Sequence, residues 1–232
     1  MRRRRVVISG VGRGLGRRIA EVLVERGDAV WGTSRTGDGP AGLQGHVTME
    51  MRDEPSIMAG AAAIAGETDG IDLLINCAGT DARSFGAPDD ARGPFDLDAE
   101  TFNAVMEVNT TGPMLVTKHL LPLLRAGRDA MVVNISSQLG SMARAQTMGS
   151  DTVYNVSKAA LNMLSLKTAA AVRGDGIGVV MVHPGWVQTD MGGPSAALTI
   201  DESARAIVDT IGSLSLEDTG RFIRWDGTDH PW

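Results

Sequence analysis

The chain has 232 residues, with 22 Lys and Arg against 28 Asp and Glu, so its formal net charge is −6. This acidic balance argues against a nucleic-acid-binding protein, which needs a basic surface to replace the counterions of the phosphate backbone. No apolar run approaches the roughly 18 residues that cross a bilayer, which argues against a membrane protein.

Residue usage narrows the class further. Aromatic residues make up only 4% of the chain, whereas there are 29 glycines, a combination that favours binding sites lined by backbone. The single cysteine, Cys77, precludes an internal disulfide and indicates a reducing compartment, so we expect a cytoplasmic protein. The four histidines lack metal-ligand spacing, and we expect no metal site. No repeat or linker divides the chain, which predicts one domain over residues 1–232.

Short β-branched runs alternate with longer amphipathic segments along the chain. The runs predict strands at residues 5–9, 29–33, 46–50, 71–75, 130–136, 178–182 and 221–225. The amphipathic segments predict helices at residues 15–26, 55–67, 99–125, 153–172 and 200–211, the third of them bent near Gly112 and Pro113. Strands that alternate with helices predict an α/β fold: a Rossmann-type, doubly wound parallel sheet of about seven strands with helices on both faces.

The first predicted strand runs into the segment Ser9-Gly-Val-Gly-Arg-Gly-Leu-Gly16, and a predicted helix follows. Glycines at such a place let the backbone turn sharply and approach a diphosphate, which then lies at the positive N-terminus of the helix. Gly10, Gly14 and Gly16 follow the pattern G-x-x-x-G-x-G. Because the pattern lies between a strand and a helix, it predicts a dinucleotide site rather than an ordinary tight turn.

Two arginines bear on the choice of nucleotide. An acidic residue at the end of the second strand would hold the ribose hydroxyls of NAD, and a cation there would instead attract a 2′-phosphate. This chain has Ser34-Arg35 at that place, and Arg13 adds a second cation inside the glycine loop. The pair favours NADP(H), with NAD(H) as the alternative cofactor.

Tyr154 and Lys158 are four residues apart on a predicted helix, so both side chains lie on one face. A neighbouring ammonium stabilises a phenolate, and we expect it to lower the pKa of the tyrosine from its usual value near ~10. The phenol could then exchange a proton with a substrate oxygen near neutral pH. Tyr154 is the only tyrosine of the chain, so it has no competitor for this role.

The glycine loop and the Tyr-Asn-Val-Ser-Lys158 segment together resemble the short-chain dehydrogenase/reductase family, whose motifs are T-G-x-x-x-G-x-G and Y-x-x-x-K. Ser9 takes the place of the threonine. The resemblance implies that Ser137 hydrogen-bonds the substrate carbonyl and that Asn109 holds a water beside Lys158. Ser141 has the family's usual spacing of about thirteen residues to Tyr154. Ser137, at the strand end, is preferred because an insertion after Gly140 accounts for its longer spacing.

The resemblance also implies the contacts of the cofactor. Residues 50–53 resemble a segment that contacts the adenine, Asn76-Cys-Ala-Gly79 resembles an N-N-A-G motif, and Pro184-Gly185 resembles a P-G motif beneath the nicotinamide. The implied cofactor-binding residues are Gly10, Arg13, Gly14, Leu15, Gly16, Arg35, Glu50, Met51, Asn76, Ala78, Gly79, Tyr154, Lys158, Pro184, Gly185, Val187 and Thr189.

The ending Asp-Gly-Thr-Asp-His-Pro-Trp232 resembles a compact subgroup with C-factor proteins and sniffer-type carbonyl reductases. This implies an NADP(H)-dependent oxidoreductase that transfers hydride between nicotinamide and a ketone, an aldehyde or a secondary alcohol, with Tyr154 as general acid and base. A dinucleotide-binding signalling protein of C-factor type is the second hypothesis.

The substrate is expected to be a small molecule bound by loops 80–96, 138–152 and 190–198. Only a short lid follows Met191, so we expect an open site. By resemblance, two helices, 99–125 and 153–172, would pair copies of the chain into a homodimer or a homotetramer.

Overall fold

Within the described residues, 3–144 and 149–232, the computed structural model contains one sheet of seven strands, and every neighbouring pair in it is parallel. The strands are β1 (Arg5–Ser9), β2 (Ala29–Ser34), β3 (Gly45–Thr48), β4 (Leu73–Asn76), β5 (Met131–Ile135), β6 (Gly178–His183) and β7 (Phe222–Arg224). Their order across the sheet is β3-β2-β1-β4-β5-β6-β7.

This order places a topological switch point between β1 and β4. From β1 the chain builds the sheet outward through β2 and β3, and from β4 it builds in the other direction through β7. In such a sheet the connections leave the switch point toward opposite faces and open a crevice at the carboxyl ends of the strands. The predicted doubly wound α/β fold is confirmed, and each predicted strand is present with ends that differ by at most two residues.

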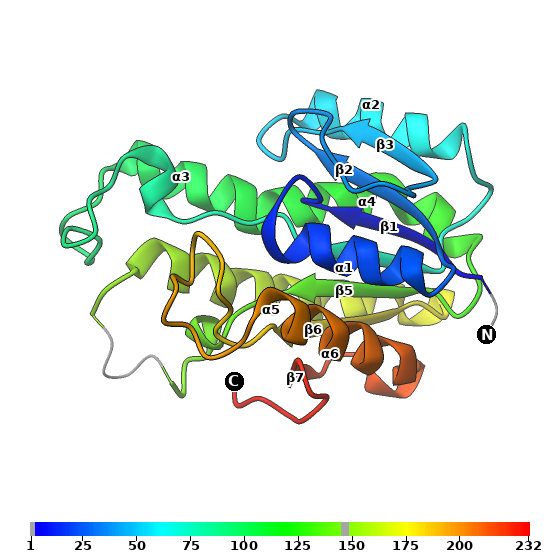
Figure 1. Cartoon of the computed structure of the whole chain (residues 1–232). Helices are drawn as coiled ribbons and strands as arrows, with labels where there is room; N and C mark the ends of the chain where they lie inside the picture. The colour runs from blue at the N-terminus through cyan, green and yellow to red at the C-terminus, as the bar shows by residue number, and fades with distance from the viewer. Residues whose placement is uncertain (1–2, 145–148) are drawn as a thin grey trace.

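Helices cover both faces of the sheet (Figure 1). The α-helices are α1 (Gly14–Glu25), α2 (Glu54–Ala65), α3 (Ala99–Met106), α4 (Gly112–Arg125), α5 (Thr152–Val172) and α6 (Ile200–Ser213). On β1, Val6 and Ile8 pack against α1 and α6, and Val7 between them packs on the face of α2, α4 and α5. The side chains of a strand alternate between faces, so strands covered on both sides read as continuous apolar runs.

The predicted helix 99–125 is helical throughout but changes type in its middle. α3 passes into a π-helical segment, η2 (Glu107–Thr111), and α4 starts at Gly112. The predicted bend is therefore a widened turn, and Pro113 lies in the first turn of α4, where a missing N–H is tolerated. Asn109 lies in the middle of η2. Short 3-10 turns complete the fold: η1 (Ala82–Phe85), η3 (Gln138–Gly140), η5 (Arg173–Asp175) and η6 (Leu216–Asp218).

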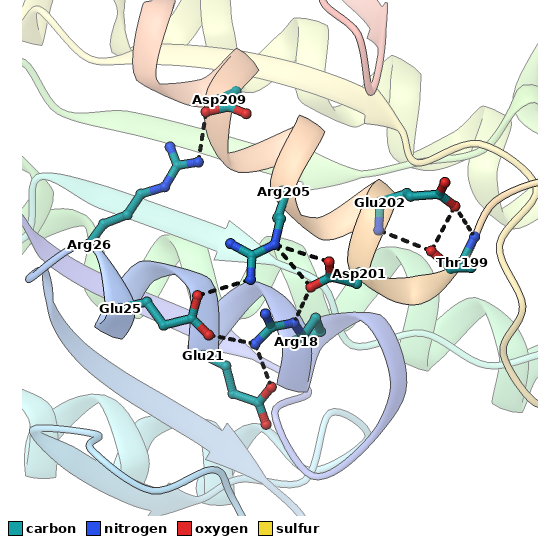
Figure 2. Close-up of polar contacts among 9 residues, drawn as sticks. All are labelled: Arg18, Glu21, Glu25, Arg26, Thr199, Asp201, Glu202, Arg205 and Asp209. Carbon is teal, nitrogen blue, oxygen red and sulfur yellow. Dashed lines mark hydrogen bonds and ion pairs between the residues drawn. The ribbon is translucent and has the colours of Figure 1, made fainter.

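Ion pairs join α1 to α6 along their exposed sides (Figure 2). Arg18 on α1 contacts Asp201 on α6 at 2.7 Å, and Arg205 on α6 contacts Glu25 on α1 at 3.2 Å. Arg18 also pairs with Glu25 at 2.8 Å and Arg205 with Asp201 at 3.0 Å, which closes a ring of alternating charge. α1 begins in the glycine loop and α6 begins after the loop that follows β6, so the ring fixes two elements that border the carboxyl edge of the sheet.

Candidate active site

A cavity of about 1190 Å³ opens at the carboxyl edge of the sheet, where the loops after β1 to β6 meet the start of α5. Most residues that the sequence analysis selected line it: Gly10, Arg13, Gly14, Leu15, Gly16, Arg35, Glu50, Met51, Ala78, Gly79, Ser137, Tyr154, Lys158, Pro184, Gly185, Val187 and Thr189. Two selected residues, Asn76 and Asn109, lie behind its wall.

The glycine loop has the shape that a dinucleotide requires. Gly10 has φ +83°, and a Cβ on it would lie 2.8 Å from the Cα of Ala78. A Cβ on Gly16 would collide with the carbonyl oxygen of Gly10. Arg13, at the N-cap of α1, makes no side-chain cap, so the first backbone N–H groups of α1 face the cavity without a capping side chain. Such N–H groups at a helix N-terminus bind phosphate.

The end of the cavity near β2 is polar and carries charges of both signs, with Arg13 and Arg35 beside Asp38 and Glu50. Arg35 is exposed and lines the cavity, while Arg13 lines it and pairs with Asp190 at 2.7 Å. Thr33 Oγ1 is buried there and has no hydrogen-bond partner in the described part of the chain. Glu50 accepts a hydrogen bond from the backbone N–H of Arg52 at 3.2 Å. These groups fit the phosphorylated ribose and the adenine of NADP(H).

Tyr154, Ser137 and Lys158 meet at the opposite end of the cavity. Tyr154 and Ser137 are joined by a side-chain hydrogen bond. Lys158 Nζ lies 5.7 Å from the centroid of the Tyr154 ring and donates a hydrogen bond of 2.9 Å to the carbonyl oxygen of Ile135, the last residue of β5. Ser141, the alternative to Ser137, is buried and does not line the cavity.

Burial controls the protonation of this end of the cavity. Burial raises the pKa of Tyr154 to about 12, and it outweighs the hydrogen bond with Ser137, which by itself lowers that pKa. Burial also lowers the pKa of Lys158 to about 8. The expected lowering of the tyrosine pKa by its lysine neighbour is therefore wrong for this structure, because removal of the phenolate from water outweighs any stabilisation of it. The phenol keeps its proton at neutral pH.

Asn109 braces the site from behind. Its Oδ1 accepts from the backbone N–H of Thr80 at 2.8 Å, and its Nδ2 donates to the carbonyl of Thr80 at 2.8 Å and to Ser157 Oγ at 2.9 Å. Ser157 in turn donates to the carbonyl of Tyr154 at 2.8 Å. A Cβ on Gly79 would lie 3.5 Å from Asn109 Oδ1 and 3.6 Å from Lys158 Nζ, so the glycine keeps the space between them open.

The side chain of Asn76 does not reach the cofactor cavity. It is buried, and its Nδ2 donates to Thr117 Oγ1 at 3.1 Å and to Asn134 Oδ1 at 2.8 Å. The prediction of Asn76 as a cofactor-binding residue is therefore corrected to a brace between β4, α4 and β5. The side chain of Asn76 turns inward because its Nδ2 finds acceptors on α4 and β5.

The loop after β6 covers one side of the cavity. Val187 and Leu198 form a β-bridge, and Trp186 Nε1 donates to the carbonyl of Gly192 at 2.8 Å. The lid is short, as the sequence predicts, and these contacts within the loop hold its own ends together. His183 precedes this loop; burial lowers its pKa to about 3, and its Nδ1 accepts from the backbone N–H of Gly185 at 3.3 Å. It is therefore neutral and structural.

The three loops predicted to bind the substrate contribute side chains to the cavity that the sequence did not single out. Residues from all three predicted loops line the cavity, among them Phe85, Leu139 and Met191. Trp186, which lies before the third loop, joins them, and the four side chains give the cavity an apolar wall. Residues 145–148 of the middle loop lie outside the described residues. Ser157 was also missed, although its place directly before Lys158 was a usable signal.

Residues 3–144 and 149–232 contain neither a metal-binding cluster nor a membrane-spanning helix. No group of three or more His, Cys, Asp and Glu side chains could hold a metal ion. No helix in the same part of the chain is long and apolar enough to span a membrane.

The parallel sheet, the glycine loop at its switch point and the polar triad opposite define a dinucleotide-binding protein of the Rossmann type. Residues 4–198 match the family model described as short chain dehydrogenase. The chain belongs to this family and is an oxidoreductase of the short-chain dehydrogenase/reductase type.

Individual proteins similar to this chain include a protein named C-signal and carbonyl reductases. The chain is 40% identical over 165 residues to the C-signal of Myxococcus xanthus, covering 71% of this chain and 95% of the relative. It is similar to an NADPH-bound carbonyl reductase from chicken fatty liver, with a TM-score of 0.88, 30% identity and 100% of both chains covered. It is also similar to the carbonyl reductase Sniffer of D. melanogaster, with a TM-score of 0.89, 29% identity and 100% of both chains covered.

Proposed function

We propose that the chain catalyses hydride transfer between NADP(H) and a ketone, an aldehyde or a secondary alcohol, as a single cofactor-binding and catalytic domain. The observation that carries the proposal is the hydrogen-bonded pair of Tyr154 and Ser137, which shares one cavity with the glycine loop. The similarity to carbonyl reductases over the full length of both chains supports it.

The chemistry divides between cofactor and protein. The bound cofactor supplies or accepts the hydride. Ser137 donates a hydrogen bond to the carbonyl oxygen, and Tyr154 gives that oxygen its proton as charge develops on it. Tyr154 is suited to act as the acid because burial raises its pKa to about 12, so it is protonated when the substrate arrives. Stabilisation of the developing alkoxide by fixed donors in a water-poor cavity lowers the barrier most.

Lys158 and Asn109 support this step. Lys158 is fixed by the carbonyl of Ile135 and, when charged, favours transfer of the Tyr154 proton because its ammonium stabilises the phenolate that is left. Asn109 fixes Thr80 and, through Ser157, the backbone of Tyr154. We propose that it also orders the water that returns a proton to the pair.

NADP(H) is the cofactor that the site favours. Arg13 and Arg35 line the β2 end of the cavity, and an acidic residue to hold the ribose hydroxyls of NAD is missing from the end of β2. The chicken carbonyl reductase, similar to this chain along its whole length, is NADPH-bound.

The test is a panel of aldehydes and ketones offered to the purified chain with NADPH or NADH, with cofactor oxidation as the readout. We expect turnover with NADPH, and a Tyr154→Phe variant that binds NADPH normally but turns over roughly 10²–10⁴-fold more slowly. A variant as fast as the parent would exclude Tyr154 as the acid.

A signalling role is the second candidate, because the chain is 40% identical to a protein named C-signal. In that case NADPH would bind tightly while no carbonyl of the panel was reduced, and Tyr154→Phe would change neither property.

A further inference from the structure

Five charged side chains form a continuous line of ion pairs on the substrate side of the cavity. Asp81 accepts from Arg83 Nε at 2.9 Å, and Arg83 lies 4.0 Å from Asp89. Asp89 lies 3.6 Å from Arg92, which pairs with Asp151 at 2.7 Å. We call these five residues the ion-pair chain. The five residues follow one another along the line in the same order as in the sequence, although they lie in three separate loops and turns.

The ion-pair chain joins the elements that form the mouth of the substrate pocket. Arg83 lies on η1 and also donates to the carbonyl of Met191 in the loop after β6, at 2.8 Å. Arg92 lies in the loop before α3, and its carbonyl accepts from the backbone N–H of Thr152 at 3.0 Å, at the start of α5. Asp151 lies three residues before Tyr154 and lines the cavity.

Three carboxylates against two guanidinium groups leave the ion-pair chain with one excess negative charge. This negative charge acts on the hydroxyl of Tyr154. Burial is the largest cause of the raised pKa of Tyr154, and the carboxylates of Asp81 and Asp151 raise it further. A field that disfavours a phenolate at this place disfavours any anion placed beside it. An anionic substrate would meet the same repulsion.

The other arginines near the pocket offer little compensation. Arg13 pairs with Asp190 at 2.7 Å, and Arg52 pairs with Glu107 at 2.8 Å. Arg144 lies toward the C-terminal residues, where it contributes to the lowered pKa of His230, a shift caused mainly by burial.

The walls that face the ion-pair chain are apolar. Phe85, Leu139, Trp186 and Met191 line this end of the cavity, and the side chain of Trp186 is half exposed. They can bury a ring or an alkyl chain but offer no charged partner. A substrate that carries a carboxylate or a phosphate would therefore lose hydration without gaining an ion pair from these walls, and the ammonium of Lys158 already donates to the carbonyl of Ile135.

We propose that the ion-pair chain determines substrate charge: it holds the mouth of the pocket together and excludes anionic carbonyl compounds in favour of uncharged, apolar aldehydes and ketones. The proposal rests on the proposed function for its reaction, and it adds the class of substrate. Asp151 is the residue through which the excess charge reaches the pocket.

The experiment compares three aromatic aldehydes of similar shape with NADPH. They are methyl para-formylbenzoate, which is neutral, para-carboxybenzaldehyde, which is an anion, and para-(trimethylammonio)benzaldehyde, which is a cation. We expect kcat/KM for the anion to be roughly fivefold to fiftyfold below that of the neutral ester, with most of the difference in KM, and the gap to narrow at high salt. The cation should be accepted at least as well as the ester.

Asp151→Asn is the decisive variant. Asp151 has φ +56°, a left-handed conformation that asparagine adopts readily, so the backbone is preserved while the charge is removed. We expect the gap between ester and anion to shrink at least threefold, and Arg92→Gln, which leaves the carboxylate of Asp151 without its partner, to widen it. Asp69→Asn is the matched control, because Asp69 pairs with Arg5 before β4 at the opposite edge of the sheet and should leave the gap unchanged.

Binding without turnover separates this proposal from the proposed function. In the NADPH complex, benzoate should bind more weakly than benzamide, and Asp151→Asn should reduce the difference. If the ester is reduced but the carboxylate is reduced equally well, the ion-pair chain does not select charge. If no aldehyde is reduced yet benzoate is still disfavoured, the proposed reaction is wrong and the charge selection stands. Equal binding of the two unreactive ligands would overturn the charge selection.

Discussion

Buried ionisable groups behave in opposite ways at the two edges of the sheet formed by the amino and the carboxyl ends of its strands. At the amino edge, Asp72 precedes β4 and accepts hydrogen bonds from the backbone and side chain of Arg5 and from the backbone N–H of Arg128. Burial by itself raises the pKa of Asp72, but these hydrogen bonds outweigh it and hold the pKa well below its usual range. At the carboxyl edge, burial dominates, and the pKa values of Tyr154 and Lys158 move toward the uncharged forms.

The difference shows what each edge is for. At the amino edge the basic start of the chain is neutralised: Arg4 pairs with Asp28 at 2.8 Å and Arg5 with Asp72 at 2.9 Å, which fastens β1 to the turns before β2 and β4. These contacts stabilise the fold. The groups at the carboxyl edge are costly to bury, and such costs are typical of sites that work on a ligand.

Lys158→Met should give the largest effects and the clearest contrast. Turnover should fall roughly 10²–10⁴-fold because the ammonium that stabilises the Tyr154 phenolate is lost. Stability should rise at pH 7 by at most about 3 kcal/mol, since burial lowers the pKa of Lys158 from 10.5 to about 8 and one pKa unit corresponds to about 1.4 kcal/mol.

The sign of this effect fixes its pH dependence. Below the folded-state pKa of about 8 both folded and unfolded chains carry the ammonium, and the wild type bears the full cost of burying it. The cost declines as the pH rises toward 10.5, so the advantage of Lys158→Met should shrink over this range. Urea unfolding at pH 7 and pH 10 would measure it, and a variant less stable than the wild type at pH 7 would contradict the account.

Asp72→Ala should have the opposite profile. Removing the carboxylate leaves two backbone N–H groups without a partner and Arg5 with only the exposed Asp69, and we expect a loss of about 2–3 kcal/mol in unfolding free energy. The pKa of Asp72 is depressed in the folded state, so its contribution is present above the unfolded pKa near 3.8 and is lost as the pH falls through the folded value. NADPH affinity and turnover of the folded fraction should stay unchanged, and a loss of either would show that the two edges are coupled.

Arg35→Ala tests the end of the cavity near β2. If Arg35 binds the 2′-phosphate, NADPH affinity should fall roughly tenfold to a hundredfold, the value of a charge-assisted hydrogen bond, while NADH affinity stays the same. Arg173→Ala, an exposed arginine on η5, is the control. Equal losses for both cofactors would mean that Arg35 does not discriminate between them.

Asp201→Asn should have a smaller effect than any of these variants. The ring of ion pairs between α1 and α6 in Figure 2 is exposed, and exposed pairs are weakened by solvent and screened by salt. We expect a slight loss of thermal stability at low salt that disappears at high salt. Asp209→Asn, which removes the single pair with Arg26, should cost less still. A loss as large as that of Asp72→Ala would place the ring among the main supports of the fold.

The choice between two serines shows where sequence reasoning needed the fold. Spacing to Tyr154 favours Ser141, and position at a strand end favours Ser137. The structure places Ser137 in the cavity with a hydrogen bond to Tyr154 and leaves Ser141 buried outside it. Asn76 is the converse case: a motif position predicted a contact, but the partners of its side chain come from α4 and β5, which no local pattern reveals.

The sequence by itself determined the parallel sheet, the glycine loop and the pair of Tyr154 and Lys158. Each depends on residues close in the chain: β-branched runs, glycines between a strand and a helix, and a spacing of one helical turn. The tertiary structure decided the sign of the tyrosine pKa shift and the assembly of the ion-pair chain from Asp81 to Asp151. Both depend on burial and on contacts between distant segments, which arise only when the sheet and its loops are in place.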